Sequence, residues 1–308
     1  MKIVALGNVM YLFIVNPLSG NGQACSLWDE IEKKLKQKNR EYSVIVSDSE
    51  VTARKFITTY LQSTTIHAVT VIGGDGTMSS VIQDIAGTGI PLAILPAGSG
   101  NDTARMFRLT THPDQFIKGL LEHRTVAIDL LNINDRFGIT VAGIGLDARI
   151  GQLVNHSFYK PILNKLGLSS FTYTIAAIIE LLSFKTFKST VTIDDMTYTY
   201  AITWLTACGN TSSYGGGLVV CPGASPTDSM LNITMLHDVG RMNILMRLFP
   251  ALLRGQPILR KGVTYRTGKE ITIETDRPIL AIIDGEVIKS TPLHVAIHEK
   301  ALNLILTR

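Results

Sequence analysis

The chain has 308 residues, of which 45% are hydrophobic and 18% are charged, and its formal net charge is +4. This length is sufficient for two domains with cores of their own. The small net charge and the lack of a Lys/Arg block argue against a nucleic-acid-binding protein. Cys25, Cys208 and Cys221 are widely spaced and include no Cys-x-x-Cys pair, which indicates reduced thiols in a cytoplasmic protein.

The N-terminal residues imitate a signal peptide, because Met1-Lys2 precedes a mostly apolar stretch. Gly7 and Asn8 interrupt this stretch, and Asn16-Pro17 ends it without a cleavage motif. We interpret Tyr11–Val15 as the first β-strand, with Met10 as a candidate start. No apolar run reaches about 18 residues, so we expect no membrane-spanning segment.

Residues 10–125 alternate short apolar runs with helical patterns. The expected strands are Tyr11–Val15, Ser43–Val46, Ala68–Ile72 and Leu92–Leu95. The expected helices, whose apolar residues recur at steps of three and four, are Gln23–Lys38, Thr52–Leu61 and Thr77–Ile85. This alternation predicts an α/β domain with a parallel sheet, whose ligands bind at the carboxyl ends of the strands.

Residues 126–300 have a different pattern, with strand-like runs separated by turns. These runs are Val191–Ile193, Tyr198–Thr206, Leu231–Leu236, Ile271–Thr275 and Ile279–Ile283. They predict a C-terminal antiparallel β-sandwich domain, with helical insertions at Lys165–Phe184 and Arg241–Arg254. A last strand, Ala301–Leu306, is a candidate to return to the N-terminal domain.

Three glycine-marked turns follow expected strands of the first domain. They are Asn16-Pro17-Leu18-Ser19-Gly20, Gly73-Gly74-Asp75-Gly76-Thr77 and Pro96-Ala97-Gly98-Ser99-Gly100-Asn101-Asp102. Glycines let a backbone approach a phosphate closely, and a strand–turn–helix junction directs N–H groups at it. Each turn alone is compatible with an ordinary loop. Together they predict a phosphate-binding site.

Two acidic turns stand out in the second domain. Asp284-Gly285-Glu286 carries two carboxylates, either of which is a candidate general base for phosphoryl transfer to a hydroxyl. Asp228 is a candidate Mg²⁺ ligand. Both segments are equally compatible with ordinary hairpin turns.

The motifs occur in the order seen in the diacylglycerol kinase catalytic family. They are Asn16–Gly20, Gly73–Thr77, Pro96–Asp102, Gly143-Ile144-Gly145-Leu146-Asp147-Ala148, Tyr214-Gly215-Gly216-Gly217 and Asp284–Glu286. From Met10 to Arg308 the chain resembles the soluble bacterial lipid kinases of that family. The six motifs in order are specific, although no single one is.

The resemblance implies the following sites. ATP is expected to be bound by Asn16, Pro17, Ser19, Gly20, Ser47, Gly73, Gly74, Asp75, Gly76, Thr77, Met78, Ser79, Ser99, Asn101 and Asp102. A structural Mg²⁺ is expected at Ser225, Asp228 and Met230, two of them through backbone carbonyls. Asp284 and Glu286 are the expected base and metal or phosphate partner, with Asp75 as the alternative base.

Three positions in two segments depart from the family pattern. Met78 is followed by Ser79-Ser80, where relatives have Asn-Glu, and Asp228 is followed by Ser229, where Gly is usual. Neither departure changes Asp75 or Asp284.

The sequence therefore predicts an ATP- and Mg²⁺-dependent lipid kinase that phosphorylates a hydroxyl of diacylglycerol or a related lipid, in a cleft between the two domains. The product would be a phosphatidic-acid-type lipid. The alternatives are a NAD kinase, which also uses Gly-Gly-Asp-Gly, and a catalytically weak regulator that binds nucleotide and lipid. A homodimer is a further expectation.

The apolar segment Phe171–Phe184 is either an acyl-chain groove or core packing. Arg241, Arg247 and Arg254 lie among apolar residues and indicate either peripheral contact with the inner face of an anionic membrane or a solvated helix face.

Overall fold

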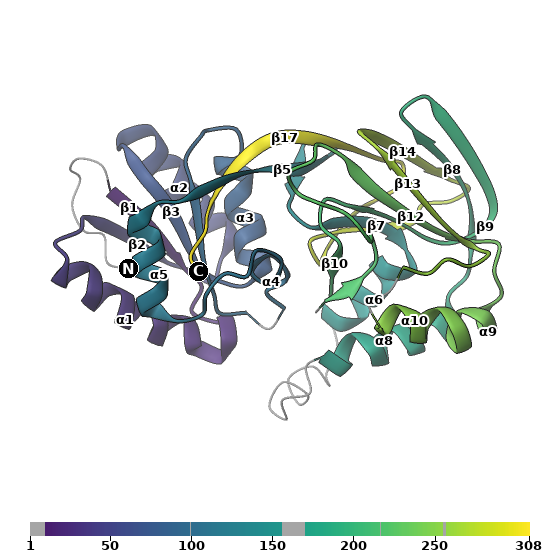
Figure 1. The fold of residues 1–308 in the computed structure, drawn as a ribbon, viewed down its shortest axis with the longest axis horizontal. Helices are drawn as coiled ribbons and strands as arrows, with labels where there is room; N and C mark the ends of the chain where they lie inside the picture. Colours follow the sequence, from purple (N-terminus) through teal and green to yellow (C-terminus); the bar gives the residue numbers. More distant parts are fainter. Residues whose placement is uncertain (1–9, 99, 156–169, 216, 255–256) are drawn as a thin grey trace. The chain divides into compact units, whose positions relative to one another are not determined.

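The computed structural model describes residues 10–98, 100–155, 170–215, 217–254 and 257–308 (Figure 1). The chain divides into two compact units. Unit 1 comprises the residues up to Ile128 together with Lys300–Arg308, and unit 2 comprises Asp129–Glu299. Each unit is described by itself.

Unit 1 contains a parallel sheet with strand order β2-β1-β3-β4. Its strands are β1 (Met10–Val15), β2 (Tyr42–Val46), β3 (Ile66–Gly73) and β4 (Leu92–Pro96). Val15 lies opposite Val46 on one side and Ile72 on the other. Every residue of β1 is buried, as expected for a strand with helices on both faces of its sheet.

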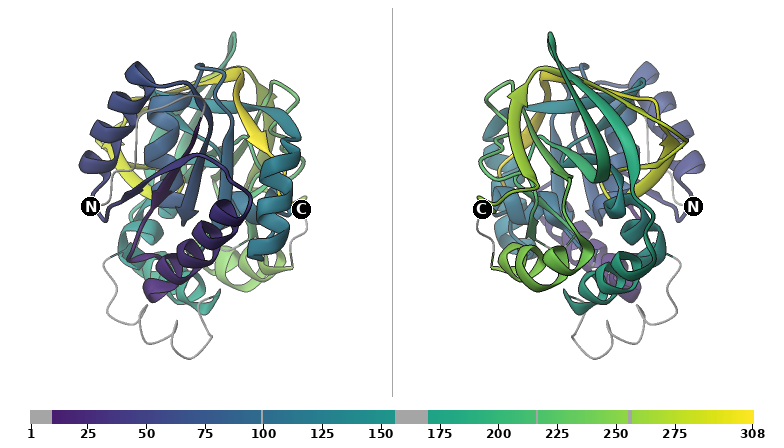
Figure 2. Two further views of the ribbon diagram at one scale, coloured as in Figure 1. Left: turned by 90° about the vertical axis from the view of Figure 1, so that its left-hand side faces the viewer. Right: turned by 90° about the vertical axis from the view of Figure 1, so that its right-hand side faces the viewer.

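Helices cover both faces of this sheet (Figure 1). They are α1 (Gln23–Gln37), α2 (Glu50–Ser63), α3 (Asp75–Ile85), α4 (Asp102–Phe107) and α5 (Pro113–Glu122), with a 3₁₀ turn at Ser19–Gly22. α1 packs against α5 on one face, and α2 packs against α3 on the other (Figures 1 and 2). Phe13, Trp28 and Phe116 lie in the core on the α1–α5 side.

The C-terminal residues complete unit 1. Strand β17 (Leu293–Ile305) pairs in parallel with β4 through Leu304 and Leu92. The backbone N–H of Thr110 donates to the Thr307 carbonyl at 2.7 Å, and that of Leu306 donates to the Arg124 carbonyl at 2.8 Å. These bonds hold the segment from Lys300 onward against the sheet and α5.

Unit 2 is built on an antiparallel sheet. Its order is β16-β15-β7-β9-β8-β14-β17, with β12 pairing to β9 and β13 to β12. The strands are β7 (Val141–Gly145), β8 (Phe187–Ile193), β9 (Met196–Gly209), β12 (Leu231–His237), β13 (Val263–Gly268), β14 (Glu270–Thr275), β15 (Leu280–Ile283) and β16 (Glu286–Ser290). Smaller pairs are β5 (Thr125–Ile133) with β6 (Arg136–Gly138), and β10 (Ser213–Tyr214) with β11 (Leu218–Val219).

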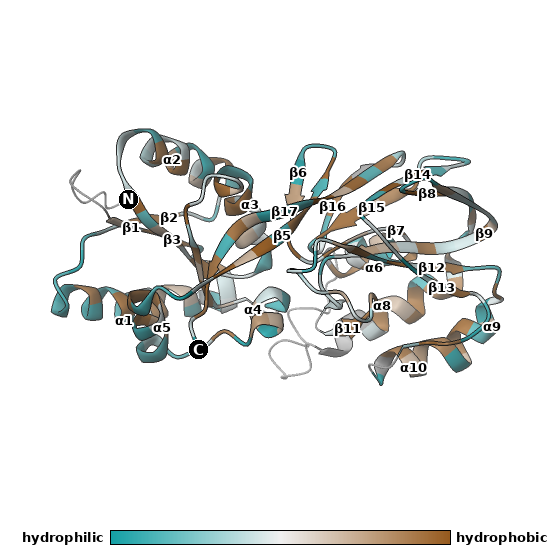
Figure 3. Cartoon of the chain, turned by 45° about the horizontal axis from the view of Figure 1, so that its top comes forward, coloured by the Kyte–Doolittle hydropathy of each residue, from teal (hydrophilic) through white to brown (hydrophobic). Residues whose placement is uncertain are grey.

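Two helical segments accompany this sheet. The first consists of α6 (Leu146–Asn155) and α8 (Ser170–Ser183), which pack together. The second is α9 (Arg241–Asn243), the π-helical turn η2 (Ile244–Leu248) and α10 (Phe249–Leu253). Hydrophobic residues occupy much of α8 and α10 (Figure 3). No helix within the described ranges is both long and apolar enough to cross a membrane.

The predicted fold class is confirmed, with parallel strands in the N-terminal half and an antiparallel β-sheet in the C-terminal half. The expected strands all form, and most of their ends are shifted by a few residues. The last strand is longer than expected, because it begins at Leu293 instead of Ala301. The expected helix at Arg241–Arg254 is interrupted by η2, because Pro250 cannot donate an intrahelical hydrogen bond and lies instead in the first turn of α10.

Five sequence-based expectations fall on parts of the chain that the structure does not describe. These are the N-terminal stretch 1–9, Ser99, Gly216 of the Tyr214–Gly217 motif, and 165–169 of the expected helix, together with the side chain of Phe171.

Candidate active site

The carboxyl ends of β1 and β3 form the centre of the candidate nucleotide site in unit 1. The chain moves from β1 outward to β2 and then returns to the far side of β1 as β3, so the strand order reverses between β1 and β3. Open α/β sheets bind ligands at such a switch point. The loop after β1 begins at Asn16, and the loop after β3 contains Gly74.

A hydrogen bond joins these two loops. Asn16 Nδ2 donates to Thr77 Oγ1 at 3.1 Å, while Asn16 Oδ1 accepts the N–H of Leu18 at 3.0 Å. Ser47, after β2, lies at the same edge, because its N–H donates to the Val15 carbonyl at 3.0 Å. The structure thus brings together three of the segments predicted to bind ATP.

The third loop, after β4, packs against both of the others through glycines. Gly20 has φ +61, and a Cβ there would lie 2.4 Å from the Ala97 carbonyl oxygen. A Cβ on Gly98 would lie 2.6 Å from the Gly74 Cα. Side chains cannot be accommodated at these contacts, so the glycines are needed for the loops to pack backbone to backbone.

Helix α3 begins at this meeting point. Its N-cap residue is Gly74, which has no side chain to cap the helix, and the Met78 N–H donates to the Gly74 carbonyl at 3.1 Å. The first N–H groups of a helix have no intrahelical acceptor and carry partial positive charge. The turn from Asp75 to Thr77 therefore presents the donors that a phosphate requires.

Asp75 has a defined structural partner in the third loop. Its Oδ2 accepts the N–H of Asp102 at 3.0 Å, and its Oδ1 accepts that of Thr103 at 3.4 Å, which caps the start of α4. Asn101 fixes the same loop, because its Oδ1 accepts the Gly98 N–H and its Nδ2 donates to the Gly98 carbonyl. Asp102 also pairs with Arg105.

The residues that depart from the family pattern after Thr77 are inside unit 1. The side chains of Met78, Ser79 and Ser80 are all buried. The Ser80 hydroxyl donates to the Thr77 carbonyl at 2.9 Å. These side chains therefore support the first turn of α3 from within the unit.

In unit 2, Asp284 is anchored inside the protein. It is 7% exposed, has φ +50, and accepts hydrogen bonds from the N–H groups of Ile139 and Thr140 and from the Thr140 hydroxyl at 2.9, 2.7 and 2.6 Å. Burial raises the pKa of Asp284, while these bonds and the charge of Arg136 oppose the shift. Glu286, at the start of β16, is less buried.

The loop at Ser225–Met230 is the expected Mg²⁺ site. Asp228 is exposed, and its Oδ1 accepts the N–H of Met230 at 3.1 Å. One carboxylate and two backbone carbonyls are hard oxygen donors of the kind that Mg²⁺ binds together with water, so the residues fit the ion. Among the described residues, no group of three or more His, Cys, Asp or Glu side chains is arranged to bind a metal.

Ser229, which departs from the family pattern, has a left-handed backbone conformation in this loop. Its φ is +60, the left-handed conformation for which Gly is usual, and its N–H donates to Asp129 Oδ2 at 2.8 Å. Asp129 is buried and was not identified from the sequence. The available signal was a single acid inside the apolar run Ala127–Leu131.

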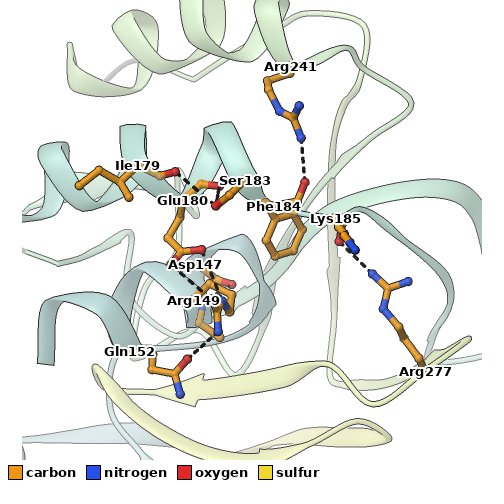
Figure 4. Close-up of polar contacts among 11 residues, drawn as sticks. Asp147, Arg149, Gln152, Ile179, Glu180, Ser183, Phe184, Lys185, Arg241 and Arg277 are labelled. Carbon is orange, nitrogen blue, oxygen red and sulfur yellow. Dashed lines mark hydrogen bonds and ion pairs between the residues drawn. The ribbon is translucent and has the colours of Figure 1, made fainter. Parts of the chain in front are cut away.

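Asp147 is a second buried acid whose role was not predicted from the sequence, although it lies in the motif Gly143–Ala148. It is on α6 and 3% exposed. On the same helix, Arg149 Nε pairs with Glu180 Oε2 of α8 at 3.4 Å (Figure 4). Asp147 lines a pocket in unit 2 whose wall also includes Ile282 and Gly285, next to Asp284.

Comparison with known proteins assigns both halves of the chain. Residues 10–133 match the family described as diacylglycerol kinase catalytic domain, and residues 140–306 match the YegS C-terminal NAD kinase beta sandwich-like domain. A diacylglycerol kinase of Mycobacterium tuberculosis is 33% identical over 301 residues, covering 96% of this chain and 94% of the relative.

Solved structures share the fold. A diacylglycerol kinase from Bacillus anthracis has a TM-score of 0.73 at 20% identity, covering 98% of each chain. An NAD kinase from Archaeoglobus fulgidus in complex with ATP has a TM-score of 0.51 at 12% identity, covering 96% of this chain and 93% of that one. The fold is that of the diacylglycerol and NAD kinases. The chain belongs to the diacylglycerol kinase family.

Proposed function

We propose that this protein is an ATP-dependent lipid kinase that phosphorylates the hydroxyl of diacylglycerol or a related lipid, giving a phosphatidic-acid-type product. The observation that supports this most directly is the meeting of three loops at the carboxyl ends of β1, β3 and β4, with the Asn16–Thr77 hydrogen bond at its centre. Family membership supports the lipid acceptor.

In the proposed reaction, the N–H groups at the start of α3 bind the ATP phosphates, together with Asn16, Pro17, Ser19, Gly20 and Ser47. A carboxylate of the Asp284–Glu286 turn accepts the proton of the lipid hydroxyl. Asp284 is a suitable proton acceptor because its pKa is raised, whereas Glu286 is the more accessible of the two carboxylates. Mg²⁺ bound together with ATP would neutralise phosphate charge. A separate, structural Mg²⁺ would be held by Ser225, Asp228 and Met230. Catalysis then depends chiefly on positioning and electrostatics.

A NAD kinase is the second candidate, because an NAD kinase of known structure shares the fold. The Asn16-Pro17 turn and the loop at Pro96–Asp102 favour the lipid acceptor, since we expect this combination in the lipid kinases. A regulator with little catalytic activity would also bind both ligands. These candidates differ in the product that they form.

The test is incubation of the purified protein with radiolabelled ATP, with and without Mg²⁺, and with either dioctanoylglycerol or NAD as acceptor. We expect label in the lipid and none in NAD. Label in NAD alone would establish a NAD kinase, and nucleotide binding without any labelled product would support the regulator.

We further propose a peripheral contact with anionic membranes through the segment from α9 to α10. Met242 and Met246 are exposed there, and Arg247 lies between them and α10. Arg241 does not belong to this surface, because its guanidinium donates to the Phe184 carbonyl at 2.9 Å (Figure 4). The same guanidinium also stacks over the Trp204 ring. Flotation with vesicles that contain anionic phospholipid tests the contact, and equal binding to neutral vesicles would contradict it.

A further inference from the structure

Two histidine rings lie against each other in unit 1, at a place that the proposed reaction does not use. The rings of His67 and His123 have centroids 4.4 Å apart and planes inclined by 34°. His67 is the second residue of β3, and His123 follows the last residue of α5, so the contact joins the sheet to one of its helices. Tyr11 of β1 lies at 87° to the His67 ring, with centroids 5.1 Å apart. The candidate nucleotide site is at the opposite end of β3, after Gly73.

The backbone departs from regular structure at both histidines. The pairing of β1 with β3 shifts by one residue between Met10 and Tyr11, which leaves His67 as an extra residue on β3. Such a bulge changes the direction in which a side chain points. His123 has φ +54 and ends α5 in the left-handed conformation, a position at which Gly or Asn is usual. Two independent departures at the two contacting residues indicate a specific contact rather than incidental packing.

Protonation is unfavourable in this contact. His123 Nδ1 is buried and has no hydrogen-bond partner among the residues that the structure describes. Since a protonated imidazole carries an N–H on each nitrogen, protonation of His123 would leave a buried donor without an acceptor. Protonation of both rings would also bring two positive charges into direct contact. Burial and the charge of His67 accordingly lower the pKa of His123.

The charged groups around the pair do not compensate for protonation. Burial raises the pKa of Tyr11, so its hydroxyl is neutral at any pH at which histidine titrates, although Arg40 opposes the shift. Glu122, the last residue of α5, is the adjoining carboxylate. It already pairs with Arg124 Nε at 3.5 Å and with Lys118 Nζ at 3.8 Å. The contact is therefore most stable when both imidazoles are neutral.

The end of α5 also holds the C-terminal segment, which lies beside this helix (Figures 1 and 2). The His123 N–H donates to the Gly119 carbonyl at 3.1 Å and completes the last turn of α5. The Leu306 N–H donates to the Arg124 carbonyl at 2.8 Å. A Cβ on Gly119 would lie 2.7 Å from the Thr307 Cα, so the two backbones are in direct contact. The last turn of α5 therefore connects the histidine pair to the strand beside β4.

We propose that the contact between His67 and His123 is a pH-sensitive switch. With both rings neutral, it holds the end of α5 and residues 300–308 on the sheet, and protonation of the rings releases them. Residues 300–308 include the strand segment beside β4, and β4 leads into the loop Pro96–Asp102. Release would therefore loosen that loop and weaken the binding of ATP in acid. This consequence for ATP rests on the proposed function, whereas the switch itself does not.

The direction of the pH effect follows from these contacts. Because folding lowers the pKa of His123 below its ordinary value of 6.5, the unfolded chain binds more protons than the folded protein in mild acid. The stability that the pair contributes is therefore fully present above about pH 6.5 and is lost as the pH falls through the pKa of the folded state.

The test is hydrogen–deuterium exchange of the full chain at about pH 7.5 and about pH 5.5, corrected for the intrinsic exchange rate at each pH. In the wild type, we expect the corrected exchange rate of residues 300–308 to rise by about tenfold at the lower pH, equivalent to about 1.4 kcal/mol. A rise of the same size in β2 would contradict a local switch, because it would report a general loss of stability.

The double variant His67→Phe/His123→Asn removes both titrating groups. Phe keeps an aromatic ring in β3, and Asn accommodates the left-handed conformation better than other residues with a side chain. We expect the corrected exchange rate of residues 300–308 in this variant to be independent of pH. His112→Phe is the matched control, because His112 is exposed at the other end of α5, and this variant should behave like the wild type.

An NMR titration of the wild-type protein keeps the switch testable even where the double variant folds poorly. We expect His123 to titrate below its ordinary value of 6.5. A pKa of 6.5 or above for His123 would overturn the switch, as would equal exchange of residues 300–308 at the two pH values.

Binding of a fluorescent ATP analogue separates the switch from the proposed function. We expect weaker binding at about pH 5.5 in the wild type and in His112→Phe, but not in the double variant. Exchange that depends on pH, together with nucleotide binding that does not, would overturn the connection to the nucleotide site alone. A protein that binds no nucleotide at either pH would overturn the proposed function, while the exchange rates would still support the switch.

Discussion

The side chains of Asn16 and Thr77 are joined by a hydrogen bond of 3.1 Å although 61 positions separate them in the sequence. The bond connects the loop after β1 to the first turn of α3, at the point where the strand order of unit 1 reverses. Two motifs that the sequence presents as separate glycine turns therefore form one structure. Three predictions concern the proposed sites, a fourth concerns a buried acid, and a fifth concerns the stability of a loop.

Asn16→Ala is expected to weaken binding of an ATP analogue by about tenfold, because it removes the bond to Thr77 and frees the turn at Leu18. The matched control is Asn303→Ala, which removes an exposed bond from Asn303 Nδ2 to the Gly89 carbonyl, also in unit 1. Equilibrium binding by fluorescence measures both. Equal losses in the two variants would show that the effect is not local to the nucleotide site.

Asp75 has a structural role, as acceptor for two backbone N–H groups, and a proposed catalytic role. Two substitutions distinguish these roles. Asp75→Ala removes the acceptor for the Asp102 and Thr103 N–H groups and should lower the free energy of unfolding by about 1 kcal/mol. Asp75→Asn keeps an acceptor oxygen but removes the charge, so it should be more stable than the Ala variant. We expect both to reduce kcat by about 100-fold. A nearly active Asn variant would indicate that Asp75 serves only as a cap.

Loss of activity in an Asp284 variant does not by itself identify Asp284 as the base, because the substitution also affects stability. Asp284→Ala leaves the buried N–H groups of Ile139 and Thr140 without their acceptor, which should destabilise the protein by about 2–4 kcal/mol. Glu286→Gln is the sharper test, because Glu286 is less buried. We expect it to keep the melting temperature and to lose phosphate transfer. Full activity in a well-folded Glu286→Gln would assign the base to Asp284.

The buried carboxyl of Asp147 predicts a pH dependence of stability. Its pKa rises from 3.8 to about 7 in the folded protein, so the native state retains a proton that the unfolded chain has lost between these values. The stability from this group is therefore fully present below about pH 4 and is lost as the pH rises through about 7. The Tyr214 side chain forms a hydrogen bond with the carboxyl, and the charge of Asp147 raises the pKa of the Cys208 and Cys221 thiols. Arg149 on the same helix pairs with Glu180.

Asp147→Asn is the comparison that isolates this effect, because the amide does not titrate. Urea unfolding at about pH 5 and about pH 8 should show the wild type losing stability relative to Asp147→Asn as the pH rises. A difference between the two proteins that stays constant with pH would contradict the buried, protonated carboxyl. An increase in the relative stability of the wild type would contradict the sign.

Ser229→Gly is expected to stabilise the protein by about 0.5–1 kcal/mol, since it removes a side chain from a residue with φ +60. The N–H bond to Asp129 is retained. Thr227→Gly is the control in the same loop, where φ is not positive, and should destabilise the protein through the added freedom of the unfolded chain. Thermal unfolding followed by circular dichroism measures both. A lower melting temperature for Ser229→Gly would show that the Ser229 side chain contributes more than its conformation costs.

The strands and long helices could be predicted because their signals are local. Buried runs such as Ala68–Ile72 and the periodic helix starting at Gln23 show their structure within a few turns of chain. The contact of Asp75 with Asp102 could not be predicted in this way, because it spans 27 residues and depends on how tightly Gly74 and Gly98 pack.

Asp129 and Asp147 were not identified from the sequence because their partners, too, are far away along the chain. Asp129 acquires its partner, the N–H of Ser229, 100 positions away. The pocket around Asp147 takes its walls from segments between Leu146 and Gly285, and no local pattern marks them as neighbours. The motif containing Asp147 was recognised, but its burial depends on tertiary packing.

The pairing of Leu304 with Leu92 has a consequence for biosynthesis. Residues 300–308 supply the strand beside β4, so this flank of β4 has no partner while the chain is still being translated. An unpaired edge of a parallel, apolar sheet can associate with other chains. Synthesis of unit 1 begins first, but its last strand follows residue 299. Unit 1 therefore receives its last strand after all the strands of unit 2 have been synthesised, and until then this flank of β4 is open to other chains.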